Sequence, residues 1–544
     1  MPNNTWYQNY DPFGNVWIST ITAAIPLLLL FYLLAVRRTA AHIAATVAAM
    51  TCAVLAVVAF HMPVHMAIGA IASGWVYGII RVGWVVLAAV FVYELAVESG
   101  HFEVIKQSIG GVTSDRRLQV LLIAFAFGSI LEGAGGGGAP VAIAGSMMIG
   151  LGFDPFAAAL LCLIANTAPV AFGGLGNPVR TLLAVTGIPG SQLSAMMGRI
   201  LPWTAAILPF WLVRSMCKWP KVRQVWPGLL VAGLTFGGIQ YYWSNYQDWG
   251  LVDIVGGMTT LVVLTLFLKV WKPKEIFRYE NERGTVPVAA SYTWLQVLHA
   301  WSPFLLLSIF VILWGVPSVT KTLDKVSWMV PVPGLDKLDF RMPPVMIKPR
   351  AESAVFEFAW LSTVGTATFF AGLISGPLLG LSFGRTMRTF GRTCVKMRAP
   401  MVAIMSMLAL GFVTRYSGMD AVMGLAMSNT GPAFPFFGTL IGWLGVALTG
   451  TDAGSNALFG SLQVITANKL GLSPVLMASA NSAGGVMGKM IAAQSVVVAT
   501  AAVGLQGREG DLFRKILPHS VALASLVGLI VYLIAKFGTS WIPG

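Results

Sequence analysis

Long apolar runs separated by short polar gaps recur along the whole chain. Several approach or reach the ~20 apolar residues that one transmembrane helix needs, and we interpret them as free of buried charge: 15–36, 40–60, 251–268, 301–317, 399–413 and 519–536. No polar segment of domain size interrupts the pattern. It therefore predicts one all-α polytopic membrane protein with about 12–14 transmembrane helices.

Composition supports this prediction. Hydrophobic residues make up 56% of the chain and charged residues 10%, against about 25% charged in soluble domains, and the mean hydropathy is +0.76. The net charge of +14 would suggest nucleic acid in a soluble protein. Here the basic residues lie between apolar runs, as the positive-inside rule requires, so we expect a lipid bilayer and no nucleic acid as partner. The four cysteines show no CxxC spacing, and no cofactor or metal is predicted.

The basic gaps divide the chain into three regions. The first membrane half is expected at 1–250, and the second at 399–544. Between them, 251–398 holds connecting spans, a basic cytoplasmic loop at 269–298 and a proline-rich external loop at 318–350. Even numbers of predicted spans separate the basic clusters 214–223, 269–283 and 385–398, which places all three in the cytoplasm; the spans are 226–243, 251–268, 299–317 and 354–382. The spans of 62–117 are not counted, because Arg81 and Glu94 interrupt an apolar stretch.

An internal repeat relates the two halves. The first copy reads EGAGGGGAPVAIAGSMMIGLGFDP (132–155) and ANTAPVAFGGLGNPV (165–179). The second reads TDAGSNALFGSLQVITANKLGLSP (451–474) and ANSAGGVMGKMIAAQS (480–495). Each copy runs from a small polar stretch through an apolar helix to a proline turn, and then through a second helix to an Ala-Asn-Thr/Ser-Ala break. The matched order of these landmarks indicates that one unit is duplicated, with one copy in each half.

The polar stretches predict broken helices. Glycines crowd 133–138 ahead of Pro140, and each glycine disfavours a helix by about 1 kcal/mol relative to alanine. Backbone freed at membrane depth needs partners in protein, water or ligand, and half-helix N-termini suit anionic substrates. Further breaks are expected at 166–169 and 173–178, with counterparts at 452–456 and 481–488. The alternative, close helix packing through small residues, stays open.

Ionisable residues beside these breaks are candidates for ion coupling. Glu132 ends an apolar run before the glycines, and Asp452 opens the second copy. Charges at membrane depth are costly, so such carboxylates would bind protons readily and are the predicted proton-coupling residues. Lys489 and Arg180 lie at the second break of each copy. An Asp452–Lys489 salt bridge, or an Arg180 that merely caps a helix end, is the structural alternative.

Known catalytic motifs are missing. The sequence contains no HExxH, Walker A loop, GxSxG or dinucleotide GxGxxG. Pro63 stands between His61 and His65, which argues against a metal site. The remaining classes are an ion-gradient carrier, a channel, or a membrane enzyme of unrecognised motif, and we expect a transporter rather than an enzyme.

At these residues the chain resembles the lactate permease family, which includes glycolate permeases. The likeness is carried by several long strings in order: YQNYDPFGNVW (7–17), AAVFVYELAVESGHFEVIKQSI (88–109), GAPVAIAGS (138–146), ANTAPVAFG (165–173), VPVPGLDKLDFRMPPV (330–345), SNALFGSLQ (455–463) and GKMIAAQS (488–495). The resemblance implies two inverted repeats with broken or re-entrant hairpin segments. It also implies proton-coupled uptake of lactate or glycolate across a bacterial inner membrane.

The predicted site combines both copies. Substrate-binding residues are expected to be Gly136, Gly137, Gly138, Asn166, Thr167, Asn177, Arg180, Ser455, Asn456, Asn481, Ser482, Lys489 and Gln494, with Glu132 and Asp452 carrying protons. Three positions depart from the family pattern: Gly137 replaces an aromatic residue, and Asn177 and Arg180 replace apolar ones. We therefore hypothesise a substrate larger or more polar than lactate. Sodium coupling, a passive anion channel and the oligomeric state stay open.

Overall fold

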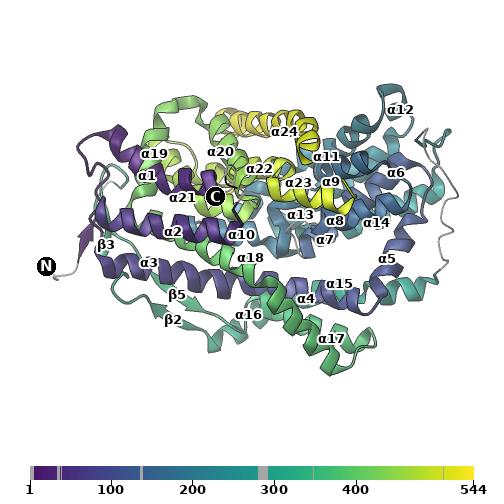
Figure 1. Cartoon of the computed structure of the whole chain (residues 1–544), viewed down its shortest axis with the longest axis horizontal. Helices are drawn as coiled ribbons and strands as arrows, with labels where there is room; N and C mark the ends of the chain where they lie inside the picture. Colours follow the sequence, from purple (N-terminus) through teal and green to yellow (C-terminus); the bar gives the residue numbers. More distant parts are fainter. Residues whose placement is uncertain are drawn as a thin grey trace.

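The computed structural model describes residues 5–33, 37, 39–134, 139–279, 292–346, 348–505 and 508–544. These residues form an elongated helical bundle with small strands at one end (Figure 1). Within them, eight helical stretches are long and apolar enough to cross a membrane: Ala41–Val58 (α2), Val64–Glu98 (α3 and α4), Arg116–Ala134 (α6 and α7), Gly190–Met216 (α11), Trp249–Val270 (including α14), Trp294–Trp314 (in α15), Phe383–Ser417 (α18) and Glu509–Phe537 (α24).

Two bent helix pairs bring the number of possible spans to ten within this part of the chain. One joins Pro155–Ala165 (α9) to Val170–Thr186, which contains α10; the other joins Pro474–Ile491, which contains α22, to Gln494–Ala502 in α23. Three apolar helices are shorter: Val16–Phe31 (α1), Pro140–Gly150 in α8, and Val364–Leu378 (α17). The predicted all-α polytopic membrane fold with broken segments is confirmed.

The remaining elements connect or cover these helices. They are α5 (His101–Gly110), α12 (Trp219–Arg223), α13 (Trp226–Tyr246), α16 (Pro317–Leu323), α19 (Met419–Met427), α20 (Phe434–Thr449) and α21 (Asp452–Leu470). The strands are β1 (Trp6–Tyr7), β2 (Trp328–Pro331), β3 (Asp339–Arg341), β4 (Arg350–Ala351) and β5 (Val355–Phe358).

Residues 62–117, whose spans the sequence left uncounted, contain one 35-residue stretch, Val64–Glu98, in which the π-helical turn Gly78–Gly83 includes Arg81. Two other segments differ from the sequence prediction. The basic segment 385–398 is helical rather than a loop, because Ser382 caps α18 by accepting from the Arg385 amide and arginine and lysine favour helices. The span expected at 354–382 is helical only at Val364–Leu378, since β5 pairs with β2.

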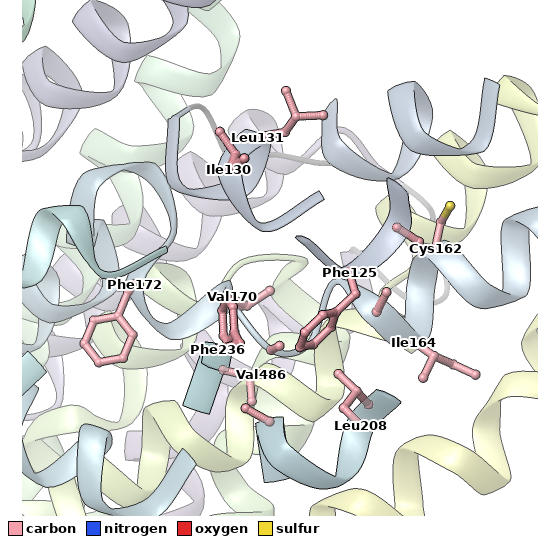
Figure 2. Packing of buried hydrophobic residues seen from close by; sticks show 14 of the residues in the cluster. Phe125, Ile130, Leu131, Cys162, Ile164, Val170, Phe172, Leu208, Phe236 and Val486 are labelled. Atoms are coloured by element: carbon pink, nitrogen blue, oxygen red, sulfur yellow. The ribbon is translucent and has the colours of Figure 1, made fainter. Parts of the chain in front are cut away.

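Close packing of buried apolar side chains holds the bundle together. Figure 2 shows part of the larger cluster, where Phe125, Val170, Phe236 and Val486 from four different segments point toward one another. The Phe125 and Phe236 ring centroids lie 5.1 Å apart. This cluster joins segments far apart in sequence, including α9, α11, α13 and α22, around the broken helices.

The N-terminus belongs to a small sheet of order β1–β3–β4. Trp6 pairs with Asp339 in parallel register, and Phe340 pairs with Ala351 in antiparallel register. Figure 1 shows this end of the molecule, with the purple strand β1 beside β3 at the left. The Gln8 side-chain amide donates to Asp339 at 2.9 Å and to the carbonyls of Arg415 and Tyr416, so the sheet is tied to the end of α18.

Buried ion pairs reinforce this end of the bundle. Arg341 on β3 pairs with Glu352 at 3.3 Å and with Asp420 of α19 at 3.1 Å. Arg415 of α18 pairs with the same Glu352 at 2.8 Å and donates to the Val185 carbonyl of α10. The Arg341 and Arg415 guanidinium groups lower the pKa of Glu352, against the effect of its burial. The network connects the small sheet to three core helices.

Burial raises the pKa of Asp339 from 3.8 to about 8. The folded protein therefore holds a proton there that the unfolded chain releases, and the free energy of unfolding should fall as pH rises from about 4 to about 8, by at most about 1.4 kcal/mol per pH unit. Asp339→Asn should remove this slope. Unfolding of both proteins in detergent across pH 5–9 measures it, and parallel pH profiles would contradict the assignment.

Candidate functional site

The break of the first copy follows α9. Asn166 occupies the C-cap position of this helix, a 3-10 turn spans Val170–Phe172, and the axes on either side differ by 59°. Gly174, Leu175 and Gly176 then adopt left-handed backbone with φ of 54°, 55° and 75°. Leu175 is an uncommon residue in that conformation, where a side chain costs about 1–2 kcal/mol. A regular helix resumes beyond this turn, so the N-terminal end of the resumed part of α10 lies inside the bundle.

The break of the second copy lies later than predicted. Residues 481–488 belong to the continuous helix α22, and the bend of 42° falls after Lys489–Ile491, which forms a 3-10 turn. Gly484 and Gly488 are packing residues of this helix: each allows α22 to approach a carbonyl of α20 closely, at Thr439 and Trp443 respectively. The expected break at 452–456 is likewise the capped first turn of α21, where Thr451 accepts from the Gly454 amide.

The two copies nevertheless share their turn chemistry. Asp154 accepts a hydrogen bond from the Ala157 amide at the start of α9, and Ser473 accepts one from the Leu476 amide at the start of α22. In each copy a proline follows the capping residue, at a helix position that tolerates it. The order of elements α7–α8–α9–α10 thus recurs as α20–α21–α22–α23.

Lys489 brings the two copies together. It is 4% exposed, and its ammonium group donates to the Gly450 carbonyl at 2.7 Å in the turn between α20 and α21. It also interacts electrostatically with Glu132 of α7 and Asp452 of α21. No Asp452–Lys489 ion pair within 4 Å forms among the described residues; the lysine is held by a backbone carbonyl between the two acids.

Both predicted proton carriers are buried. Asp452 is 3% exposed, accepts a hydrogen bond from Ser482 and lies against the backbone of Gly485. Glu132 is 4% exposed and packs over Gly173, where a Cβ atom would come within 2.8 Å of its Oε1. In the described part of the chain Glu132 Oε2 and both side-chain polar atoms of Asn166 make no hydrogen bond of ordinary geometry, although the two side chains interact with each other.

A polar network links the helix starts. Asn456 donates to the Pro178 carbonyl at 3.2 Å and accepts from Asn481 at 2.9 Å. Asn481 also contacts Ser455 at 3.4 Å and accepts from Gln463 at 3.2 Å. Sequence analysis did not include Gln463, which lies on α21 two turns beyond Asn456. The network fixes the start of α21 against the resumed helix of α10.

The remaining predicted residues contact other groups, and one of them, Gln494, lies beside the same Gly450 that Lys489 binds. Arg180 faces Trp249, its guanidinium carbon 5.8 Å from the ring centroid, and one of its terminal nitrogens has no partner among the residues described. Asn177 is half-buried on the same helix. Thr167 donates to the Ile164 carbonyl within its own helix end, and Gln494 is exposed near Gly450. Gly136, Gly137 and Gly138 lie outside the described residues.

Buried acids around one lysine, at the meeting point of broken membrane helices, are the features of a multi-pass membrane transporter. The chain belongs to the L-lactate permease family, whose model matches residues 19–538. The L-lactate permease of Salmonella typhimurium is 44% identical over 99% of this chain and 100% of its own length. The glycolate permease GlcA of Escherichia coli is 43% identical, covering 97% and 98%.

The resemblance inferred from the sequence is therefore confirmed, as are the transporter class and the multi-pass location expected for the bacterial inner membrane. Among solved structures, the YdaH transporter of Alcanivorax borkumensis aligns with 84% of this chain and 86% of its own, at 15% identity and a TM-score of 0.43.

Asn456→Ala should destabilise the protein by about 1–3 kcal/mol, because it removes the buried hydrogen bonds that Asn456 donates to the Pro178 carbonyl and accepts from Asn481. Asn468→Ala changes an exposed residue of the same helix and should stay within about 0.5 kcal/mol of wild type. Unfolding in detergent measures both. Equal stability of the two variants would show that the network does not hold α21 against α10.

Proposed function

We propose that this chain imports lactate or a related small 2-hydroxy-monocarboxylate together with protons. The observation that carries the proposal is the electrostatic interaction of one buried lysine, Lys489, with two buried acids, Glu132 of the first copy and Asp452 of the second. Relatives that the chain matches over almost its full length are named L-lactate permease and glycolate permease. Both substrates are small monocarboxylates that carry a hydroxyl beside the carboxylate.

Charge balance supports proton coupling. Two ionised acids and one lysine leave a net negative charge in the site, which would repel a carboxylate anion. A proton on one acid removes that repulsion and frees Lys489 to attract the substrate. Anion and proton then favour each other's binding, which is the thermodynamic requirement of symport.

Two buried polar side chains without a hydrogen bond of ordinary geometry indicate where the substrate binds. Asn166 and Glu132 Oε2 face the same region as Lys489, from the other repeat. A carboxylate near Lys489 with its hydroxyl toward Asn166 would satisfy groups that otherwise make no hydrogen bond of ordinary geometry. Movement of one repeat relative to the other would then expose this position to each side in turn.

Uptake of labelled L-lactate into proteoliposomes tests the proposal. An inward gradient of one pH unit should drive about tenfold accumulation if one proton accompanies each anion, since one unit is worth about 1.4 kcal/mol. Unlabelled glycolate should compete with labelled lactate for uptake. Competition by pyruvate and by small dicarboxylates then ranks the substrate specificity. Protein-free liposomes are the control. Accumulation that follows a sodium gradient instead would assign sodium as the coupling ion, and equilibration without accumulation would indicate a channel.

A larger or more polar carboxylate is the second candidate, favoured by the buried, partly unpaired guanidinium group of Arg180. If Arg180 binds substrate, Arg180→Ala should raise the lactate KM roughly tenfold to a hundredfold, the loss of a charged hydrogen bond. Arg199→Ala is a matched control, because Arg199 donates to Asn245 and to the Trp541 carbonyl away from the site. If the KM of Arg180→Ala is unchanged, Arg180 does not bind substrate, and its role is structural, through its contact with Trp249.

A further inference from the structure

A third acid, Asp253, is buried beside the proposed site. It lies in the first turn of α14 and has no exposed surface, and neither carboxylate oxygen has a hydrogen-bond partner within the described residues. The sequence analysis placed it inside the apolar run 251–268, which was interpreted as free of buried charge. That interpretation is wrong at this position.

Asp253 is packed directly against the segment that carries Glu132. A Cβ atom on Gly133 would lie 2.8 Å from the Asp253 Cβ, so only glycine permits this approach. One turn further along α14, Gly257 packs just as closely on the Ala126 carbonyl and Ile130. These contacts hold α14 close to α7, with Asp253 on their interface and Glu132 next to Gly133 in the chain, its carboxyl group over Gly173.

Asp253 has no structural function that its contacts reveal. Acids in the first turn of a helix often stabilise its N-terminus, but the Asp253 carboxylate accepts no amide hydrogen bond among the described residues, and the side chain that caps this segment is Asp248, which accepts from the Gly250 amide at 2.8 Å at the start of the 3-10 turn ahead of α14. A buried carboxylate without any hydrogen bond is costly unless it is protonated or paired. A carboxyl group in this environment is therefore suited to bind a proton or another cation.

Few charges surround it. Glu132 of α7 is the charged group that acts on Asp253 among the described residues, and Lys489 acts in turn on Glu132. The other helices that pack on α14, namely α10, α13 and α15, contribute no charged group to Asp253 in the same part of the chain. Two acids that face each other away from water cannot both ionise cheaply.

We propose that Asp253 and Glu132 form a carboxyl pair that carries the transported proton. This inference rests on the proposed symport. A proton from the outer solution adds to one carboxylate of the pair as the substrate anion binds near Lys489. The same O–H bond breaks to water on the inner side after the anion leaves. Asp452, fixed by Ser482, then positions Lys489 rather than carrying the proton.

The test separates net transport from exchange in proteoliposomes. Asp253→Asn resembles a permanently protonated group, so exchange of labelled for unlabelled lactate should persist within about threefold of wild type. Accumulation driven by a proton gradient should fall at least tenfold, and an entrapped pH dye should report no proton entry with lactate. Glu132→Gln should likewise lose accumulation driven by a proton gradient and proton entry with lactate.

The control is Glu103→Gln, which removes an exposed acid paired with Lys106 on α5 and should behave as wild type. Gradient-driven accumulation by Asp253→Asn at the wild-type level would overturn the inference and leave the proposed function standing. Loss of both exchange and accumulation, unrestored in Asp253→Glu, would assign Asp253 a structural role and equally overturn it. Failure of wild-type protein to accumulate lactate would instead reject the proposed function.

Discussion

A lysine ammonium group buried in a membrane bundle is the constraint on which the rest of this structure depends. Lys489 requires a carbonyl and negative charges close by, because an unpaired cation in that environment is costly. Its partners come from the end of α7, the turn after α20 and the start of α21. The two repeats must therefore meet at this point, near the middle of the bundle, where α10, α21 and α22 lie side by side (Figure 1).

The irregular backbone follows from the same requirement. Breaks at membrane depth are stable only where other groups satisfy the freed amides and carbonyls. Here Lys489 binds the Gly450 carbonyl within the second copy, and Asn456 of the second copy donates to the Pro178 carbonyl of the first. The second copy therefore supplies a donor for the irregular backbone of the first as well as for its own.

Sequence pattern predicted the repeat well because its landmarks are local. Proline after a capping residue fixes the helix starts at Pro155 and Pro474 whatever the surroundings. The second break was misplaced because its position depends on a tertiary contact. Gly484 and Gly488 suggest a helix break in the sequence alone, but in the structure they allow the close packing of α22 on α20. Asp253 was missed because one acid does little to the hydropathy of a long apolar run. The available signal was the acid itself, since an ionisable residue inside a span is a candidate by default.

The pairing of β1 with β3 bears on how the chain is made. Trp6 is among the first residues synthesised, while its partner Asp339 follows more than three hundred residues later. At the usual ~5–20 residues per second, the N-terminal strand waits on the order of tens of seconds for that partner. The helices that precede residue 339 are therefore made before the small sheet can close, and its closure ties the first residues of the chain to a segment made after more than half of the chain.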